Sequence, residues 1–438
     1  MSVKISIVGT GYVGLVTGAC FAELGHNVIC IDKDEGKIER IKVGDLPIFE
    51  PGLDQLIERN VEAGRISFST DLAASCKDRD AIFIAVGTPS NSEDGRADLK
   101  YVFAAAKEIA ESIDGYTVVI TKSTVPVGTN RKVGEILEGN ISTGASYSVA
   151  SNPEFLREGA AIADFMEPDR IVVGCDEEAG QEIVANIYAP LTVLGHNYMA
   201  TDIESAEVIK YASNAFLAVK VSFINEIADL CEAVGANVSK VAEGMGTDKR
   251  IGGAFLRPGP GWGGSCFPKD TRALFNTALD YGVDTLVVKG AIDANTNRKS
   301  AMVARIEKAC DGKLNGKKIA VLGLTFKGQT DDMRESPTLD ILPALVENGA
   351  DVVAFDPSNP EEAPKLLPQV KTVGTPVEAA ENADVLVIAT DWGVFSSYKL
   401  SELAEAMKTP VMVDLRNMFS REQALNAGFD EFLGLGNI

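Results

Sequence analysis

The chain has 438 residues, enough for two or three domains, and its 45% apolar and 24% charged residues are typical of a globular protein. Its 41 lysines and arginines against 63 aspartates and glutamates give a net charge of −22. Because this charge repels phosphate backbones and anionic lipid, nucleic acids and membranes are excluded as partners, and an anionic ligand needs local cations to hold it.

The cysteines indicate a reducing compartment. The seven residues, at positions 20, 30, 76, 175, 231, 266 and 310, are odd in number and form no C-x-x-C pair. This argues against a disulfide framework and against a zinc cluster, so we expect no metal. No apolar run approaches the roughly 18 residues of a membrane span, and Met1 leads into a strand-like segment without room for a signal peptide. We therefore expect a soluble, cytoplasmic protein.

Short β-rich runs alternate with helical stretches through about the first 200 residues. The expected strands lie at 3–8, 27–31, 80–86, 117–121, 147–151 and 171–174. This alternation is typical of a parallel sheet covered by helices on both faces.

One long helical pattern then runs from Thr201 to Gly235 without an internal glycine or proline. Thr201 with Glu204 fits a capping box at its start, and Gly235 fits the glycine that follows a helix. A helix of about 33 residues spans about 50 Å, so we interpret it as a bridge between two domains. Its apolar residues cover more than one face, which indicates burial against a second subunit or packing within the chain. Shorter helices are expected at 239–245, 268–281 and 284–309.

The α/β alternation resumes after Asn315-Gly316. We expect strands at 318–323, 351–355, 384–389 and 410–414, and helices near 337–348, 376–382 and 399–407, the first of them capped by Ser336 and opened by Pro337. Three strand segments of the first part recur here in the same order: 5–11 resembles 319–325, 28–32 resembles 352–356, and 80–85 resembles 384–389. This recurrence indicates two Rossmann-like units around a helical middle, although any buried parallel strand has a similar composition.

A dinucleotide fingerprint, Gly9-Thr10-Gly11-Tyr12-Val13-Gly14, follows the first strand and opens a helix. Gly9 permits the tight turn, Gly11 lets the backbone approach the pyrophosphate, and Gly14 allows close packing of helix on strand. The second strand ends at Asp32, 18 residues beyond Gly14, near the roughly 20 expected for the acid that binds the ribose. A carboxylate there repels a 2′-phosphate, so the fingerprint predicts NAD.

Other candidate ligand contacts follow later strands. Val86-Gly87-Thr88-Pro89 and Ser123-Thr124 stand at carboxyl ends of strands, where doubly wound sheets bind ligands. The second Rossmann-like unit lacks the glycine fingerprint and carries Lys327 and Arg334 in that turn. A second dinucleotide is therefore not expected, and Lys327 fits a phosphorylated ligand instead.

The stretch from Gly259 to Asp270 is the strongest candidate for a chemical centre. It reads Gly259-Pro260-Gly261-Trp262-Gly263-Gly264-Ser265-Cys266-Phe267-Pro268-Lys269-Asp270. Pro268 suits a first helical turn, which places Cys266 just before a helix N-terminus, where the helix dipole favours a thiolate. Asp270 would lie close enough to exchange protons with an adduct of the cysteine or with water.

Polar residues on the long helix and after the 147–151 strand add to this set. Lys210 and Asn214 are one helical turn apart and, with Asn225, form a polar stripe that is able to stabilise an oxyanion. Glu154 and Glu158 offer two candidate general bases.

At these residues the sequence resembles the UDP-glucose/GDP-mannose dehydrogenase family along nearly its whole length. The matching motifs are Gly9 to Gly14, Glu50-Pro51-Gly52, 86–89, 123–126, 152–156, 263–266, Lys269-Asp270, Phe326-Lys327 and 334–336. The resemblance implies two successive NAD-dependent oxidations that convert the 6-hydroxymethyl group of a nucleotide sugar, here expected to be UDP-glucose, to a carboxylate. Cys266 would form a thiohemiacetal and then a thioester, Lys210 and Asn214 would hold the oxyanions, Asp270 would assist proton transfer, and Glu154 with Thr124 would handle water or a proton.

The resemblance also assigns binding residues. For NAD they are Gly9, Gly11, Tyr12, Val13, Gly14, Asp32, Lys37, Thr88, Ser123, Glu158 and Arg334. For the nucleotide sugar they are Glu154, Phe155, Leu156, Arg157, Lys210, Asn214, Arg250, Phe255, Arg257, Gly263, Phe326, Lys327 and Arg416. In the family, Arg250 comes from the neighbouring subunit, which agrees with a homodimer formed through the long helix.

The expected fold is thus α/β, with two Rossmann-like doubly wound parallel-sheet domains joined by a long central helix and a helical middle domain. Residues 1–200 would bind NAD, 201–312 would carry the dimer contact and the catalytic cysteine, and 313–438 would bind the UDP-sugar. Relatives that oxidise GDP-mannose or UDP-N-acetylhexosamines share the chemistry and are the main alternative. A single-step β-hydroxyacid dehydrogenase and a non-catalytic NAD-responsive binding protein are the other two.

Overall fold

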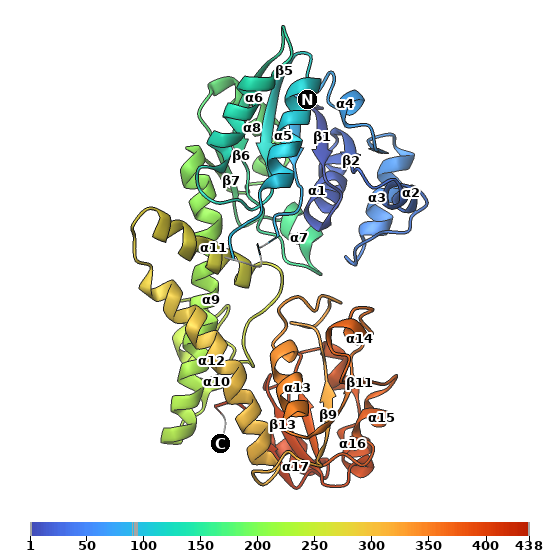
Figure 1. The fold of residues 1–438 in the computed structure, drawn as a ribbon, viewed down its shortest axis with the longest axis vertical. Helices are drawn as coiled ribbons and strands as arrows, with labels where there is room; N and C mark the ends of the chain where they lie inside the picture. Colours follow the sequence, from blue (N-terminus) through green and yellow to red (C-terminus); the bar gives the residue numbers. More distant parts are fainter. Residues whose placement is uncertain (1, 90, 92–94, 437–438) are drawn as a thin grey trace. The chain divides into compact units, whose positions relative to one another are not determined.

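The computed structural model describes residues 2–89, 91 and 95–436. The chain forms two compact units, the first ending at Ser213 and the second beginning at Asn214 (Figure 1).

In the described part of the first unit, eight strands form one sheet in the order β3-β2-β1-β4-β5-β6-β7-β8. Their bounds are β1 Lys4–Val8, β2 Asn27–Ile31, β3 Ile66–Ser69, β4 Ala81–Ile84, β5 Tyr116–Thr121, β6 Ser146–Ser151, β7 Ile171–Cys175 and β8 Tyr198–Thr201. All neighbours run parallel except β6 and β7, which are antiparallel, so the predicted parallel sheet is confirmed apart from this pair. The short strands β3 and β8 were not predicted.

Helices cover both faces of this sheet. The helices of the unit are α1 Tyr12–Glu23, α2 Glu35–Lys42, α3 Leu53–Glu62, α4 Leu72–Ser75, α5 Lys100–Ser112, α6 Thr129–Asn140, α7 Ala161–Met166 and α8 Glu178–Val193. One core contains apolar residues of α1, α3, α7 and α8 with the sheet, and a second contains those of α4, α5 and α6. Because both faces are buried, the carboxyl ends of the strands remain for ligand contacts.

The long helix α9 extends from Ile203 to Val234, 32 residues or about 48 Å (Figure 1). The predicted glycine terminus is confirmed, because Gly235 follows with a φ of +78°. The predicted Thr201/Glu204 capping box was wrong. Thr201 ends strand β8, and Asp202 caps the helix by accepting a hydrogen bond from the Ser205 amide (2.7 Å). Glu204 instead pairs with Arg131 of α6.

Three helices follow, α10 Val238–Gly246, α11 Phe267–Asp280 and α12 Leu286–Ala309, close to the predicted ranges. The loop from Thr247 to Cys266, which contains the predicted chemical centre, connects α10 to α11.

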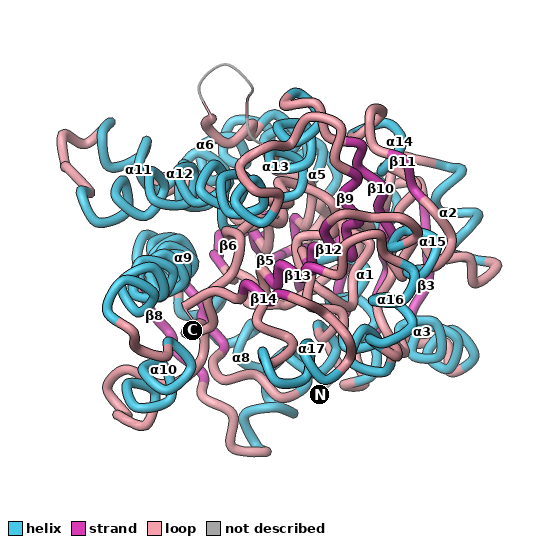
Figure 2. Tube along the Cα trace, turned by 90° about the horizontal axis from the view of Figure 1, so that it is seen from below, coloured by secondary structure: helices cyan, strands magenta, loops and turns pink. Residues whose placement is uncertain are grey.

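Six strands in the described part of the second unit form a parallel sheet in the order β11-β10-β9-β12-β13-β14. They are β9 Lys318–Leu322, β10 Asp351–Phe355, β11 Lys371–Thr372, β12 Val385–Ile388, β13 Val411–Asp414 and β14 Glu431–Leu433. The remaining helices are α13 Thr338–Glu347, α14 Ala363–Leu366, α15 Pro376–Ala380, the 3-10 turn Gly393–Ser397, α16 Leu400–Ala406 and α17 Arg421–Asn426. Figure 2 shows α13 on one side of these strands and α15 and α16 on the other, and two separate cores fill the two sides. Helix α13 begins one residue later than predicted, with Pro337 rather than Ser336 at the cap.

The predicted similarity between the two ends of the chain corresponds to a repeat in the structure. The first six positions of the large sheet and all six of the small one follow the same order, with β1, β2 and β4 corresponding to β9, β10 and β12. In each unit the glycine after the first strand donates its amide to the end of the second, Gly9 to Ile31 (2.7 Å) and Gly323 to Phe355 (2.8 Å). Equivalent turns therefore stand at equivalent sheet edges, and they differ in side chains rather than in topology.

Candidate active site

The glycine turn after β1 has the shape that a dinucleotide requires. Gly9 has a φ of +104°, and a Cβ on Gly14 would lie 2.0 Å from the Gly9 oxygen, so both positions exclude a side chain. A Cβ on Gly11 would meet no described atom within 4 Å, so this edge of the turn is open for a ligand. The turn opens α1, whose first amides are available to a phosphate.

Asp32 stands directly after β2 beside this turn. Its carboxylate accepts hydrogen bonds from the Thr10 amide (3.0 Å), the Thr10 hydroxyl (2.7 Å) and the Lys37 ammonium (2.9 Å). Burial alone would raise the pKa of Asp32, but these hydrogen bonds outweigh it and lower the pKa to about 2. Asp32 is therefore an anion at every physiological pH, as a ribose-binding acid requires.

Two further loops lie at the carboxyl ends of β4 and β5. The Thr88 hydroxyl donates to the Thr124 carbonyl (3.0 Å), and the Ser123 hydroxyl donates to the Val86 carbonyl (2.6 Å). These contacts join the two loops, so Thr88, Ser123 and Thr124 occupy one region of the first unit.

The loop after β6 carries a buried ion pair. The Lys210 ammonium lies 2.9 Å from a Glu154 carboxylate oxygen, and both side chains are 6% exposed or less. Burial would raise the pKa of Glu154, but the charge and hydrogen bond of Lys210 hold it below its ordinary value. The second carboxylate oxygen accepts from the Leu156 amide (2.6 Å). The Arg170 guanidinium and the Lys210 ammonium both lie over the Phe155 ring, 4.0 and 5.3 Å from its centroid.

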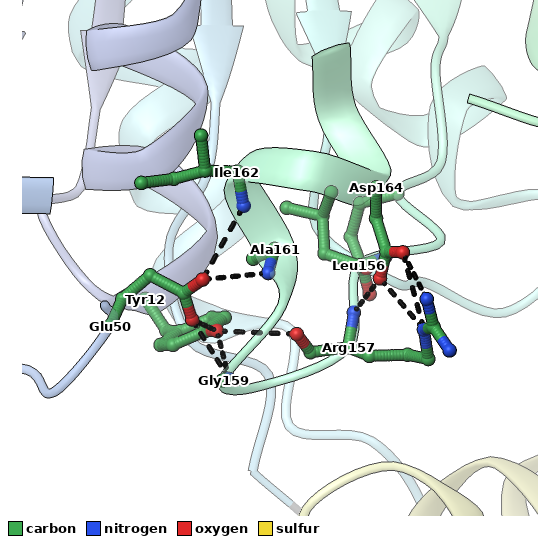
Figure 3. A network of polar contacts seen from close by, with 9 residues as sticks. Tyr12, Glu50, Leu156, Arg157, Gly159, Ala161, Ile162 and Asp164 are labelled. Atoms are coloured by element: carbon green, nitrogen blue, oxygen red, sulfur yellow. Dashed lines mark hydrogen bonds and ion pairs between the residues drawn. The ribbon is translucent and has the colours of Figure 1, made fainter. Parts of the chain in front are cut away.

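The rest of this loop is shown in Figure 3. Arg157 pairs with Asp164 (2.6 Å), and its side chain is 67% exposed. Glu158 follows, half-buried. On the other side of the loop, the Glu50 carboxylate faces Tyr12 and the backbone of Gly159. Four of the predicted sugar residues, 154–157, and one predicted cofactor residue, Glu158, thus follow one another in this segment.

Lys122 belongs to the same buried region, and the sequence analysis missed it. Its ammonium donates to the Asn152 side-chain oxygen (3.0 Å) and to the Tyr188 hydroxyl (3.3 Å). Burial lowers the pKa of Lys122 to about 7, with the charge of Lys210 adding to this and that of Glu154 opposing it. Its place between Thr121 and the Ser123-Thr124 motif was the only signal in the sequence.

In the second unit, Cys266 is the N-cap residue of α11, as predicted, and is partly exposed. Asp270 in the first turn is fully buried and accepts from the Asn214 amide (2.6 Å) and the Lys269 ammonium (2.6 Å). The Cys266 thiol lies 3.5 Å from the Ser265 hydroxyl. Cysteine, carboxylate, amide and ammonium are therefore grouped at the start of one helix.

Helices α9 and α12 hold the glycine-rich loop before Cys266. Asn225 accepts from the Gly259 amide (2.8 Å), and Arg298 donates to the Gly259 carbonyl (3.1 Å). Asn295 bonds both backbone groups of Trp262 (2.8 and 3.0 Å). The polar stripe Lys210, Asn214 and Asn225 is buried, and Asn225 fixes the loop through its backbone. Arg298 and Asn295 were not predicted, because only the fold brings α12 to this loop.

The predicted sugar-nucleotide residues of the second unit fall into two groups. Arg257 and Arg416 line a pocket of about 380 Å³ together with residues of α10. Arg416 donates to the Phe326 carbonyl (2.8 Å), and the Phe326 ring occupies the space beside Gly264. Gly263 excludes a side chain because its Cβ would lie 2.1 Å from the Glu335 oxygen.

The other residues of this set are more exposed. Phe255 has a positive φ of 63°, and its ring packs near Phe267. The Lys327 ammonium lies over the Phe326 ring. Arg250 pairs with Asp248 and Arg334 with Asp332, with side-chain exposures of 89% and 58%. The structure therefore brings Arg257, Arg416 and Phe326 together and leaves Arg250 and Arg334 at the surface.

The described residues form neither a metal-binding cluster nor a membrane-spanning helix. No cluster of three or more His, Cys, Asp or Glu side chains there has the geometry of a metal site. None of the helices in the described ranges combines the length and apolar composition needed to cross a membrane.

Substitutions at Gly11 and Gly14 separate ligand approach from packing. Gly11→Ala should leave the thermal midpoint unchanged, because its backbone φ of −69° suits alanine and its Cβ meets no described atom. NADH binding, measured by fluorescence titration, should weaken about tenfold or more as the methyl group meets the pyrophosphate. Gly14→Ala should lower the thermal midpoint instead. NADH binding to Gly11→Ala as tight as to the wild type would place the pyrophosphate elsewhere.

Lys122→Met should change how stability depends on pH. The unfolded chain keeps this amine protonated up to about pH 10.4, whereas the folded chain releases the proton near pH 7. Between these two pH values the unfolded state binds one more proton than the folded state. The free energy of unfolding of the wild type therefore rises with pH, by up to about 1.4 kcal/mol per pH unit. Lys122→Met has no amine here and lacks this rise. Thermal midpoints at pH 7 and pH 9 measure the difference, with Lys77→Met, an exposed lysine, as control. Midpoints of wild type and Lys122→Met that move in parallel would contradict the assignment.

The chain is similar to known proteins along most of its length. Three profiles of the UDP-glucose/GDP-mannose dehydrogenase family match the chain: the NAD binding domain over residues 3–192, the central domain over 204–297 and the UDP binding domain over 320–421. The UDP-glucose 6-dehydrogenase of Rhizobium meliloti (strain 1021) is 52% identical over 428 residues, 97% of this chain and 98% of that one.

Solved structures of related dehydrogenases are also similar to this chain. A UDP-glucose dehydrogenase from Pyrobaculum islandicum has a TM-score of 0.92 at 36% identity, covering 100% of this chain and 98% of that one. A UDP-D-ManNAc dehydrogenase from Pyrococcus horikoshii has a TM-score of 0.86 at 28% identity, covering 99% of each chain. With its glycine turn, its cysteine at a helix start and these relatives, the chain belongs to the UDP-glucose/GDP-mannose dehydrogenase family.

Proposed function

We propose that the chain oxidises UDP-glucose to UDP-glucuronate in two NAD-dependent steps. The observation that carries this proposal is the placement of Cys266 at the start of α11, in the helix that also holds Asp270 against Asn214. A single alcohol oxidation needs no nucleophile, whereas oxidation of an aldehyde to an acid by hydride loss needs one. The similarity to UDP-glucose 6-dehydrogenases over nearly the full length supports the same substrate.

NAD fits the first unit. The turn at Gly9, Gly11 and Gly14, with Tyr12 and Val13, would receive the pyrophosphate, and Asp32 with Lys37 would hold the ribose. Thr88, Ser123, Glu158 and Arg334 are the remaining residues that we assign to the cofactor. NAD supplies the hydride acceptor in each of the two oxidations.

Cys266 provides the covalent step. After the first oxidation its thiolate would attack the C6 aldehyde, forming the C–S bond of a thiohemiacetal and leaving an oxyanion that takes up one proton. Loss of hydride in the second oxidation gives the thioester. Attack by water then breaks the C–S bond, releasing the carboxylate and restoring the thiolate. Covalent capture also retains the aldehyde between the two oxidations.

Charged and amide groups around this chemistry have separate roles in the proposal. Lys210 and Asn214 would stabilise the oxyanions, since buried donors act strongly in a site of low dielectric. Asp270 would move the proton of the thiohemiacetal. Glu154, kept ionised by Lys210, would act with Thr124 on the alcohol proton of the first step and on the water of the last.

We assign the sugar nucleotide first to two arginines of the second unit. Arg257 and Arg416, which line the pocket of the second unit, supply positive charge for the diphosphate in an otherwise acidic protein. The other residues that we assign to the sugar nucleotide are Glu154, Phe155, Leu156, Arg157, Arg250, Phe255, Gly263, Phe326 and Lys327. The 28% identity to a UDP-D-ManNAc dehydrogenase keeps UDP-N-acetylhexosamines, with GDP-mannose, as the second candidate substrates.

We also propose that the enzyme is a homodimer through α9. Phe216, Phe223 and Leu230 are 64%, 44% and 55% exposed, and their seven-residue spacing places them on one face. A face of this kind can pair with itself across a twofold axis. Arg250, exposed in the single chain, would then serve the sugar nucleotide of the partner subunit. We place the enzyme in the cytoplasm, a location that its free cysteines support.

The reaction is tested by counting NADH formed per sugar nucleotide consumed. With UDP-glucose the wild type should give two, and GDP-mannose and UDP-N-acetylmannosamine should react far more slowly. Cys266→Ser should lose about three orders of magnitude in turnover, whereas Cys310→Ala, a buried cysteine, should keep it. Two NADH per molecule of another sugar nucleotide would correct the substrate and leave the two-step mechanism unchanged. One NADH would indicate a single-step dehydrogenase, and none a binding protein.

Phe223→Glu tests the dimer. Sedimentation velocity should give a dimer for the wild type and a monomer for this variant, because a charge replaces the centre of the apolar face. Val43→Glu, at an exposed apolar residue outside α9, is the matched control and should stay dimeric. A Phe223→Glu protein of unchanged mass would exclude this face as the interface.

A further inference from the structure

Glu50 is a buried carboxylate that the mechanism above does not use. Its side chain lies in the loop between α2 and α3, and the residue is 7% exposed. No lysine or arginine among the described residues forms an ion pair with it. Backbone amides supply the compensation, since Ala161, the first residue of α7, donates to one carboxylate oxygen (2.8 Å) and Gly159, two residues before the helix, donates to the other (2.8 Å).

Tyr12 completes this cluster from the cofactor turn. It is the first residue of α1, and its hydroxyl donates to the same Glu50 oxygen that Gly159 reaches (Figure 3). Gly159 also donates to the Tyr12 hydroxyl (3.0 Å). Burial raises the pKa of Tyr12, and the hydrogen bond to Glu50 raises it further, so the phenol stays protonated and remains a donor.

The segment that Glu50 holds carries the residues assigned to proton transfer and to the cofactor. It begins with Glu154, paired with Lys210, continues through Glu158, and ends at the amides of Gly159 and Ala161. One end is therefore fixed by the buried ion pair and the other by Glu50. Tyr12, in the glycine turn, hydrogen-bonds both Gly159 of this segment and Glu50, which itself accepts from Gly159 and Ala161.

We infer that Glu50 is a positioning residue that couples the glycine turn to the 154–161 segment, so that binding of a dinucleotide orders the segment. The inference rests on the proposed function for the identity of the ligand. Loss of the Tyr12 hydroxyl removes the coupling but leaves the backbone hydrogen bonds of Glu50 in place. Loss of the Glu50 charge weakens both the contact with Tyr12 and the backbone hydrogen bonds, because an amide has one acceptor oxygen for the four donors, which are the Tyr12 hydroxyl and the amides of Gly159, Ala161 and Ile162.

Hydrogen–deuterium exchange of the full-length protein tests the coupling without turnover. In the wild type, NADH should slow exchange in peptides spanning 157–163. In Tyr12→Phe, NADH at saturating concentration should bind and leave exchange in these peptides unchanged. Tyr116→Phe is the matched control, since it removes a tyrosine hydroxyl that bonds Ser148 in the same unit, and it should respond as the wild type does. Glu50→Gln should exchange fast in these peptides with or without NADH.

Kinetics give the second readout. Tyr12→Phe should lower kcat/KM for UDP-glucose about tenfold, the effect of one buried hydrogen bond to a charged group, with a smaller change in the dissociation constant for NADH. An equal NADH effect on exchange in wild type and Tyr12→Phe would overturn the inference, as would absence of any NADH effect in the wild type. If Glu50→Gln does not fold, the exchange and the kinetics of Tyr12→Phe alone test the inference. A wild type that binds NADH and orders 157–163 but does not oxidise UDP-glucose would refute the proposed function alone.

Discussion

The buried ion pair between Glu154 and Lys210 is the interaction on which the arrangement of the first unit's candidate site depends. Removing two charges from water costs several kcal/mol per ion, and only close contact and further hydrogen bonds offset it. Here the contact is 2.9 Å, and the Leu156 amide donates to the second carboxylate oxygen. Because α9 supplies the cation and the loop after β6 the anion, the pair fixes that loop against the helix.

Helix α9 carries three buried polar side chains that lie one or a few helical turns apart. Lys210 reaches Glu154, Asn214 reaches Asp270, and Asn225 reaches the loop before Cys266. A helix holds such spacings rigidly, whereas loops do not. The duplicated sheets supply equivalent turns, and the difference between a glycine turn at Gly11 and a basic one at Lys327 accounts for a cofactor site in one unit and a proposed UDP-sugar site in the other.

Much of this arrangement was predictable from local sequence. The glycine turn, Asp32, and Cys266 at a helix start depend on backbone rules that act over a few residues. The strands β3 and β8 were missed because they are four residues long and not continuously apolar. Asp202 replaced Thr201 as the helix cap because β8 extends to Thr201. The contacts of Lys122, Glu50 and Arg298 join residues 30 to 111 positions apart, and spacing alone gives no sign of them.

The central claim is the covalent step at Cys266. Glu154→Gln should still accept a hydrogen bond from Lys210, and it should slow both the first oxidation and the hydrolysis of the thioester, so the incubation must be long. After incubation with UDP-glucose and NAD, an acid quench and peptic digestion, mass spectrometry should find a UDP-glucuronyl group on the peptide that contains Cys266. NADH formation without this adduct, or an adduct on another cysteine, would contradict the account.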